Sequence, residues 1–320
     1  MRHFFILFIL FVGLVYGQYT NTNGKVIDKP FSELLKWRKN SSEPNLSYIE
    51  TSNEWQQAIN SDKDFFIWIG HATFLIKVNN KVILTDPIFS ERASPFKRFG
   101  PKRLINTPLS VSDIPNVDIV TISHNHYDHL DIPSLKKISK QFKNVSFFVP
   151  EGDKRLLIKN NIDNIYDLNW WNEISIGDFK ITFTPVQHWS RRGINDKNKS
   201  LWGGWYIKTP TYSIYHAGDS GYSNDFKDTQ AKLGSPDIAF IPIGAYDPEW
   251  FMSESHMNPE EAVQVSIDLN AKKAYGMHWG TFALTDEDTL EPKERLEEEL
   301  EKQNLNNFTT LIPGQVVYLD

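Results

Sequence analysis

The feature that most restricts the fold of this chain is the stretch SHNHYDHLD at residues 123–131, which directly continues the apolar run VDIVTIS. It holds three of the chain's 9 histidines together with two aspartates. Residues two apart in an α-helix point about 200° away from each other, whereas in an extended strand they share a face. His124 and His126 therefore point the same way only at the end of a strand. The stretch predicts either a polar surface turn or a strand end whose side chains converge on a ligand.

The composition limits both that ligand and the partners of the chain. None of the 320 residues is a cysteine, so disulfides and thiolate metal sites are excluded, and any metal must be held by histidine and carboxylate. The formal net charge of −6 argues against nucleic acid as the main partner, because neutralising phosphates requires a basic surface. The length is sufficient for one large domain or two smaller ones.

The N-terminus predicts export. Residues 1–17, MRHFFILFILFVGLVYG, contain one arginine, then an apolar run from Phe4 to Val15, then a small-residue cleavage site. That order is typical of a secretory signal peptide. The run is shorter than the roughly 20 residues that span a bilayer, and a buried helix is the alternative interpretation. We expect a periplasmic or secreted protein that stays associated with the membrane if the segment is not removed.

The rest of the chain predicts one α/β domain preceded by a short segment. Residues 18–64, which we call the lead-in, are polar and contain one expected helix at 31–40. From 65 to 320, strand and helix patterns alternate. Strands are expected within 65–69, 73–87, 117–123, 145–150, 179–185, 205–219, 237–246 and 273–280, and helices over 133–142, 258–270 and 290–305. Asn79 and Asn80 predict a hairpin turn, because asparagine tolerates positive φ.

Three more polar residues follow apolar runs far along the chain. His188 ends ITFTPVQH, Asp219 ends SIYHAGD and His278 ends AYGMH. Strand ends are where open α/β sheets present functional groups. Each residue alone is more often structural. Together with Asp128 and His129 they supply enough ligands for two neighbouring metal ions, which is what the spacing H-x-H-x-D-H predicts.

These motifs resemble a known family. H-x-H-x-D-H followed by separate His, Asp and His is similar to the metallo-β-lactamase superfamily, whose fold is an α/β four-layer αββα sandwich. The segments WIGHATFLIKVNNKVILTDPIFSERASPFKRFGPKR, ISHNHYDHLD, QHWSRR, IPIGAYDPEWFM and HWGTFAL resemble, more narrowly, the N-acyl-phosphatidylethanolamine-hydrolysing phospholipase D family. The resemblance covers residues 65–320.

The resemblance implies a two-zinc centre. His124, His126 and His188 would hold one zinc ion, Asp128, His129 and His278 the other, and Asp219 would bridge both. Asp86, in LTDP, would lie beside the metals and orient ligands by hydrogen bonds. The alternative is an aspartate that merely closes a strand before Pro87. Ligand type alone also suits manganese or iron.

The resemblance also implies the reaction. Two metal ions about 3.5–4 Å apart lower the pKa of a bridging water and stabilise the entering and leaving oxygens. Hydroxide would attack phosphorus, releasing an N-acylethanolamine and phosphatidic acid. Asp128 and Asp219 would act as catalytic metal ligands. His256, in SESHMNP, would contact the substrate or act as a general acid, and the alternative is a loop histidine that precedes a helix.

A lipid substrate predicts further contacts. Arg191 and Arg192, close to His188, would hold a phosphate. Trp250, Phe251 and Met252, in YDPEWFM, would contact acyl chains, and Tyr246 would contribute to substrate binding. The helix at 31–40 and the loop SPFKRFGPKR at 94–103 combine apolar and cationic residues that suit a membrane surface, although the sequence favours core packing and a solvated face for both segments.

The expected partners are therefore a phospholipid, a membrane surface and a second copy in a homodimer, without nucleic acid. Two rival functions stay open. The first is a dizinc hydrolase on the same fold acting on a lactone, a cyclic phosphodiester or a β-lactam, because a fold does not determine a substrate. The second is a non-catalytic metal-binding protein. That reading expects missing ligand positions, and here all seven are occupied.

Overall fold

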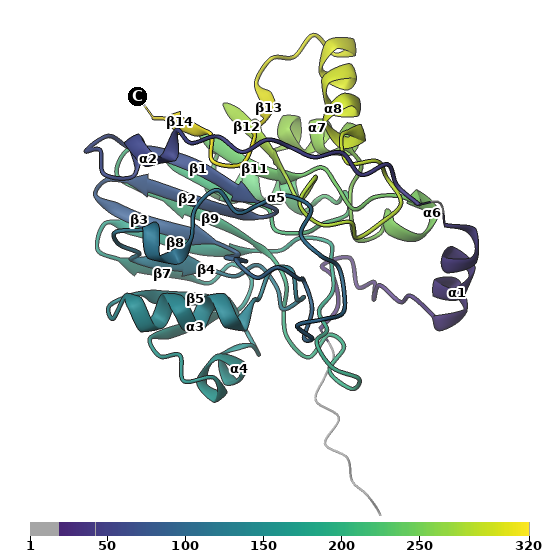
Figure 1. Ribbon diagram of the computed structural model, residues 1–320, viewed down its shortest axis with the longest axis horizontal. Helices are drawn as coiled ribbons and strands as arrows, with labels where there is room; N and C mark the ends of the chain where they lie inside the picture. Colours follow the sequence, from purple (N-terminus) through teal and green to yellow (C-terminus); the bar gives the residue numbers. More distant parts are fainter. Residues whose placement is uncertain (1–18, 42, 320) are drawn as a thin grey trace, which may run out of the picture.

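The computed structural model describes residues 19–41 and 43–319, and within them two seven-stranded sheets pack face to face between layers of helices (Figure 1). The first sheet has the order β14-β1-β2-β3-β4-β5-β6 and the second β13-β12-β11-β10-β9-β8-β7. The predicted αββα sandwich is confirmed. The expected signal peptide at 1–17 lies outside the described residues.

The first sheet consists of β1 (Phe65–Gly70), β2 (Thr73–Val78), β3 (Lys81–Thr85), β4 (Ile119–Thr121), β5 (Ser146–Pro150), β6 (Ile165–Leu168) and β14 (Val316–Tyr318). The second consists of β7 (Glu173–Ile176), β8 (Phe179–Thr184), β9 (Gly204–Lys208), β10 (Ser213–His216), β11 (Ile238–Pro242), β12 (Lys273–Met277) and β13 (Phe308–Thr310). One half of each sheet is antiparallel and the other half is parallel. The first parallel pair is β3–β4 in the first sheet and β10–β11 in the second. The parallel halves bring several carboxyl ends of strands to one edge.

The helices are α1 (Phe31–Asn40), α2 (Trp55–Ala58), α3 (Ile132–Gln141), α4 (Lys154–Lys159), α5 (Asp225–Leu233), α6 (Glu249–Met252), α7 (Pro259–Asp268) and α8 (Glu291–Lys302), with a 3₁₀ turn at Val111–Asp113. Figure 1 shows α3 and α4 on one side of the paired sheets and α7 and α8 on the other. The α7 helix begins as expected, because Asn258 and Glu261 form a reciprocal capping box and Pro259 occupies the first turn.

Aromatic rings fill the space between the two sheets. Phe74 of β2 stacks on Phe240 of β11 with ring centroids 3.9 Å apart, and Phe66 of β1 meets Tyr275 of β12 at 4.8 Å. A separate apolar cluster, which includes Leu135 of α3, covers the outer face of the first sheet. Both faces of this sheet are therefore buried, which explains why its strands read as continuous apolar runs.

Two details of the strand predictions are informative. The Asn79-Asn80 turn is confirmed, with φ values of 47° and 63°. The run 205–219, which we expected as one strand, is an antiparallel pair, β9 and β10, because the Thr-Pro-Thr segment between them forms a turn closed by Thr209 and Tyr212. The short strands β6, β7, β13 and β14 were not predicted, since runs of three or four residues are too short to show a strand pattern.

Two parts of the lead-in differ in how deeply they are buried. Asn21 is 2% exposed and lies against the strand ends of the second sheet, whereas α1 has no buried residue and projects from the body beside α6 (Figure 1). Of the helices formed by the described residues, none combines the length and the apolar character needed to cross a bilayer.

Candidate metal centre

Three histidines from two strand ends form a first cluster. His124 and His126 follow β4, and His188 follows β8. His126 Nδ1 lies 2.8 Å from His124 Nε2 and 3.2 Å from His188 Nε2. The structure thus brings together the three residues of the first expected ligand set. We call this cluster the first metal position.

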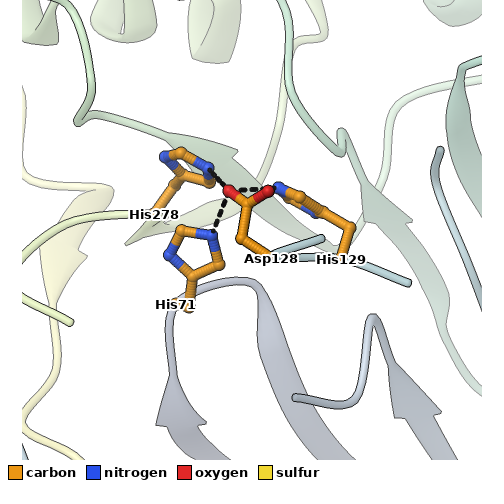
Figure 2. Close-up of side chains that lie close together, drawn as sticks. All are labelled: His71, Asp128, His129 and His278. Atoms are coloured by element: carbon orange, nitrogen blue, oxygen red, sulfur yellow. Dashed lines mark hydrogen bonds and ion pairs between the residues drawn. The ribbon is translucent and has the colours of Figure 1, made fainter. Parts of the chain in front are cut away.

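A second cluster lies next to it and is shown in Figure 2. Asp128 Oδ2 is surrounded by three Nε2 atoms, at 3.0 Å from His71, 3.5 Å from His129 and 3.4 Å from His278. The ligand atoms of these four residues lie within 4.8 Å of one another. We call Asp128, His129 and His278 the second metal position.

Asp219, in the loop after β10, lies between the two positions. Its Oδ2 is 3.1 Å from His129 Nε2, 3.8 Å from His124 Nε2 and 4.0 Å from His188 Nε2. Its Oδ1 is 3.1 Å from His278 Nε2. One carboxylate therefore reaches residues of both positions, as a bridging ligand must.

The electrostatics of the two positions differ. At the first position, burial lowers the pKa of His126 to about 4 and that of His124 well below its usual value, helped for His124 by the neighbouring imidazoles. At the second position, burial acts to lower the pKa of His278, but Asp219 and Asp128 outweigh it and raise the pKa to about 9. The first position is therefore a neutral cluster, and the second a set of ionised carboxylates compensated by protonated imidazoles.

The donor set fits metal ions. Buried polar atoms are normally hydrogen-bonded, because an unsatisfied one is costly. Within residues 19–41 and 43–319, three side-chain atoms of the expected ligands that face this centre have no hydrogen-bond partner, namely His129 Nε2, His278 Nε2 and Asp219 Oδ1. A divalent cation at the second position would satisfy these atoms and replace the protons on its histidines.

Hydrogen bonds behind the ligands hold their rings in place. Asp86 accepts from the Ser123 backbone N–H at 2.7 Å and the Ser123 hydroxyl at 2.6 Å, and lies 2.7 Å from His129 Nδ1. His188 Nδ1 lies 2.9 Å from the Ser255 carbonyl. Both contacts leave Nε2 of the histidine directed at the centre, the usual arrangement behind metal-binding histidines. Asp86 thus lies where the sequence predicted.

His256 faces the same centre. Its Nδ1 is 3.9 Å from Asp219 Oδ2, and its ring centroid is 5.2 Å from that of His188 and 5.6 Å from that of His278. Burial lowers its pKa to about 3. His256 is therefore a neutral imidazole in this geometry.

The expected substrate contacts separate into two groups. Trp250 and Phe251 lie on α6, where Phe251 packs on Trp37 of α1 at 5.3 Å between ring centroids. The hydroxyl of Tyr246, by contrast, donates to Glu291 of α8 at 2.8 Å, and this contact points to a structural role.

The two arginines after His188 also differ. Arg192 Nη1 donates to the carbonyls of Asn125 at 2.8 Å and Leu130 at 2.7 Å, so its guanidinium supports the backbone of the ligand loop. Arg191 is exposed and donates to the carbonyl of Gly193 in its own loop. The hydrogen bonds of Arg192 to these two carbonyls account for the position of its guanidinium without a bound phosphate.

Sequence reasoning missed three residues near the centre. His71 follows β1 in GHAT, so the rule that located the expected ligands, a polar residue at a strand end, would have found it. Asn21 Oδ1 accepts from the His188 backbone N–H at 3.0 Å, and the ammonium of Lys29 donates to the carbonyl of Phe251. Nothing in the lead-in sequence indicates these two contacts, because they join residues more than 160 positions apart.

Comparison with known proteins identifies the family. A profile described as "Beta-lactamase superfamily domain" matches residues 81–279. The chain is 37% identical over 266 residues to the N-acyl-phosphatidylethanolamine-hydrolyzing phospholipase D 1 of Caenorhabditis elegans, covering 79% of this chain and 75% of that protein. The chain belongs to the metallo-β-lactamase superfamily. Its fold and its His/Asp clusters make this superfamily member a metal-dependent hydrolase.

Two further relatives agree with this assignment. The mitochondrial N-acyl-phosphatidylethanolamine-hydrolyzing phospholipase D of Saccharomyces cerevisiae is 39% identical over 237 residues, which cover 72% of this chain and 50% of that protein. The structure of Igni18, a metallo hydrolase from the archaeon Ignicoccus hospitalis, covers 81% of this superfamily member and 99% of its own chain, with a TM-score of 0.61 and 20% identity. The predicted family is confirmed by the sequence relatives, and the fold by the structure.

Proposed function

We propose that the protein is a zinc-dependent phospholipase D that hydrolyses N-acyl-phosphatidylethanolamine to an N-acylethanolamine and phosphatidic acid. The observation that carries the proposal is the 37% identity, over three quarters of its length, to a relative with that name. The paired metal positions with their shared Asp219 support it, since phosphodiester hydrolysis commonly uses two adjacent metals.

Each position has residues for one metal ion. His124, His126 and His188 would hold the first, Asp128, His129 and His278 the second, and Asp219 would reach both. Such ions ionise water near neutral pH and neutralise charge on a phosphodiester. Zinc suits the all-N/O donor set.

The side chains around the metals would handle the rest of the substrate. Nδ1 of His256 is buried without a hydrogen-bond partner, so it is available to donate to a phosphate or leaving-group oxygen. The Lys29 ammonium, held at the carbonyl of Phe251, adds positive charge on the α6 side of His256. Both features suit an anionic headgroup.

The face formed by α1 and α6 suits a lipid surface. Phe31 is 70% exposed, Leu35 53% and Trp250 51%, and Lys36 Nζ lies 4.6 Å from the Trp250 ring centroid. Exposed apolar side chains beside cations are typical of surfaces that rest on anionic membranes. We propose that this face docks on the membrane that supplies the substrate, and that residues 1–17 direct export of the protein.

A product assay combined with metal analysis tests the function. The purified protein is incubated with vesicles that contain N-acyl-phosphatidylethanolamine, and products are identified by mass spectrometry. We expect N-acylethanolamine and phosphatidic acid, two zinc ions per chain, loss of activity with a chelator and its return with zinc. Hydrolysis of a lactone, a cyclic phosphodiester or a β-lactam without lipid hydrolysis would contradict the proposal and support the rival hydrolase.

The docking face is tested by Phe31→Ser combined with Leu35→Ser. We expect several-fold lower activity on vesicles and unchanged activity on a short-chain soluble analogue. Ile158→Ser is the matched control, because Ile158 is 54% exposed on α4, on another side of the molecule (Figure 1). Equal effects of both changes on vesicle activity would contradict the docking proposal.

A further inference from the structure

His71 occupies a constrained position between two parts of the metal centre. It follows Gly70 at the end of β1, where the register with β2 shifts, and its φ of 55° is uncommon for a residue with a side chain. Its backbone N–H donates to Thr281 Oγ1 at 2.7 Å, and its carbonyl accepts from the His278 N–H at 3.1 Å. The backbone of His71 is therefore tied to the loop that carries His278.

The side chain of His71 reaches the other ligand of the same position. His71 is 1% exposed, and its Nε2 lies 3.0 Å from Asp128 Oδ2 (Figure 2). Its ring lies against that of His278, with centroids 3.9 Å apart, and meets the edge of Phe282 at 5.3 Å. One residue thus contacts both Asp128 and His278, which are 150 positions apart.

Hydrogen-bond geometry distinguishes His71 from the histidines around it. His129 and His278 place Nε2 at 3.5 and 3.4 Å from Asp128 Oδ2 and at 3.1 Å from an oxygen of Asp219, but neither atom makes a hydrogen bond, as expected of atoms directed at an ion. His71 Nε2 is at hydrogen-bond distance from that oxygen. A nitrogen that donates its proton to a carboxylate has no lone pair left for a metal.

We propose that His71 is a positioning residue of the second metal position, which donates from Nε2 to Asp128 and supports the ring of His278 without itself binding the metal. The hydrogen bond fixes which oxygen of Asp128 turns toward the ion, as Asp86 fixes the ring of His129. The proposal rests on metal binding by this centre, and it does not depend on the lipid substrate.

Metal titration of the metal-free protein tests the proposal. Outer partners of metal ligands typically contribute about 10–100-fold to metal affinity. We expect His71→Leu to weaken binding of the second Zn²⁺ equivalent by about this factor, with the first equivalent unchanged. His71→Gln places an amide N–H near Nε2 and should recover most of the loss. With Co²⁺, only the absorbance change of the second equivalent should differ from that of the wild type.

His216→Leu is the matched control. His216 is also buried, but its Nε2 lies 3.0 Å from the Ala72 carbonyl and not from a carboxylate ligand. We expect this variant to lose stability and keep both affinities. Wild-type binding of the second equivalent in His71→Leu would overturn the proposal. Equal losses in the Leu and Gln variants would overturn it too and indicate that His71 is a ligand. An absence of lipid hydrolysis by the wild type would leave these titrations interpretable.

Discussion

The two halves of the metal centre use different physical means to hold their ligands. The first position consists of three imidazoles that burial keeps neutral, whereas the second contains Asp128 and histidines such as His278, whose pKa is raised to about 9. Behind the first position lie the Ser123 hydroxyl, the Ser255 carbonyl and the lead-in residue Asn21, and behind the second lie Asp86 and the imidazole of His71. One edge of the two sheets therefore supports a metal position made of neutral ligands and, beside it, a metal position made of charged ligands.

This difference has consequences for assembly of the centre. A neutral cluster costs little to keep without a metal, because no charge is buried. The second position already holds opposite charges at low exposure, and removing one partner of such a set leaves an uncompensated charge, which costs about 3–5 kcal/mol. We therefore expect substitutions to act on the two positions unequally, except at the residue that they share.

Asp219→Ala should have the largest effect, because Asp219 contacts both positions. We expect both metal equivalents to bind more than about 100-fold more weakly, beyond the range typical of outer partners, and hydrolysis to fall at least in proportion. Asp225→Ala is the control, since Asp225 is equally buried but accepts from the Thr22 hydroxyl outside the centre. Retention of one tight equivalent in Asp219→Ala would show that the positions are independent.

Asp128→Asn should separate the two positions. The change keeps the shape of the side chain and removes the charge that His278 and His129 compensate. We expect one zinc per chain by metal analysis, in place of two, with affinity for the remaining ion within a few fold of the wild type. Loss of both ions would show that the first position needs Asp128 to bind its metal, which contradicts this prediction.

Asn21→Ala should act on the first position from the lead-in. The change leaves the buried backbone N–H of His188 without its acceptor and removes one of the two acceptors of the Trp202 indole N–H, which costs about 1–3 kcal/mol of folding stability. We expect weaker binding of the first metal equivalent and little change in the second. Asn23→Ala, which removes an exposed contact to Gln187, should change stability by less than about 0.5 kcal/mol. Similar effects of both substitutions would exclude a specific role for Asn21.

The residues above show how far sequence reasoning reaches. Strand ends can be read from apolar runs, and His188, Asp219 and His278 were found because each ends one; the fold class followed from the same alternation and the family resemblance. Asn21 was not found, because its partner is a backbone N–H that any residue at position 188 would offer. Tyr246 was expected to bind substrate, whereas its hydroxyl donates to Glu291, a contact that the sequence does not indicate because a side chain's direction depends on packing between distant helices.

The smallest expected effect is a pH dependence of the metal-free protein. His126 has a folded-state pKa of about 4 against an ordinary value of about 6.5, so as pH falls below 6.5 the unfolded chain binds a proton that the folded chain does not, and stability decreases. His278 has the opposite sign: its pKa of about 9 gives stability that is complete below pH 6.5 and is lost as pH rises through 9.

Thermal unfolding should therefore show a maximum near pH 6.5, with the first position responsible for part of the acid arm and the second for part of the alkaline arm. His126→Asn should flatten only the acid arm and His278→Asn only the alkaline arm, each by a few degrees. This follows because each substitution removes a single group whose proton binding differs between the two states. If both variants flattened the same arm, the two positions would share one electrostatic character, and the contrast between a neutral half and an ionic half would not hold.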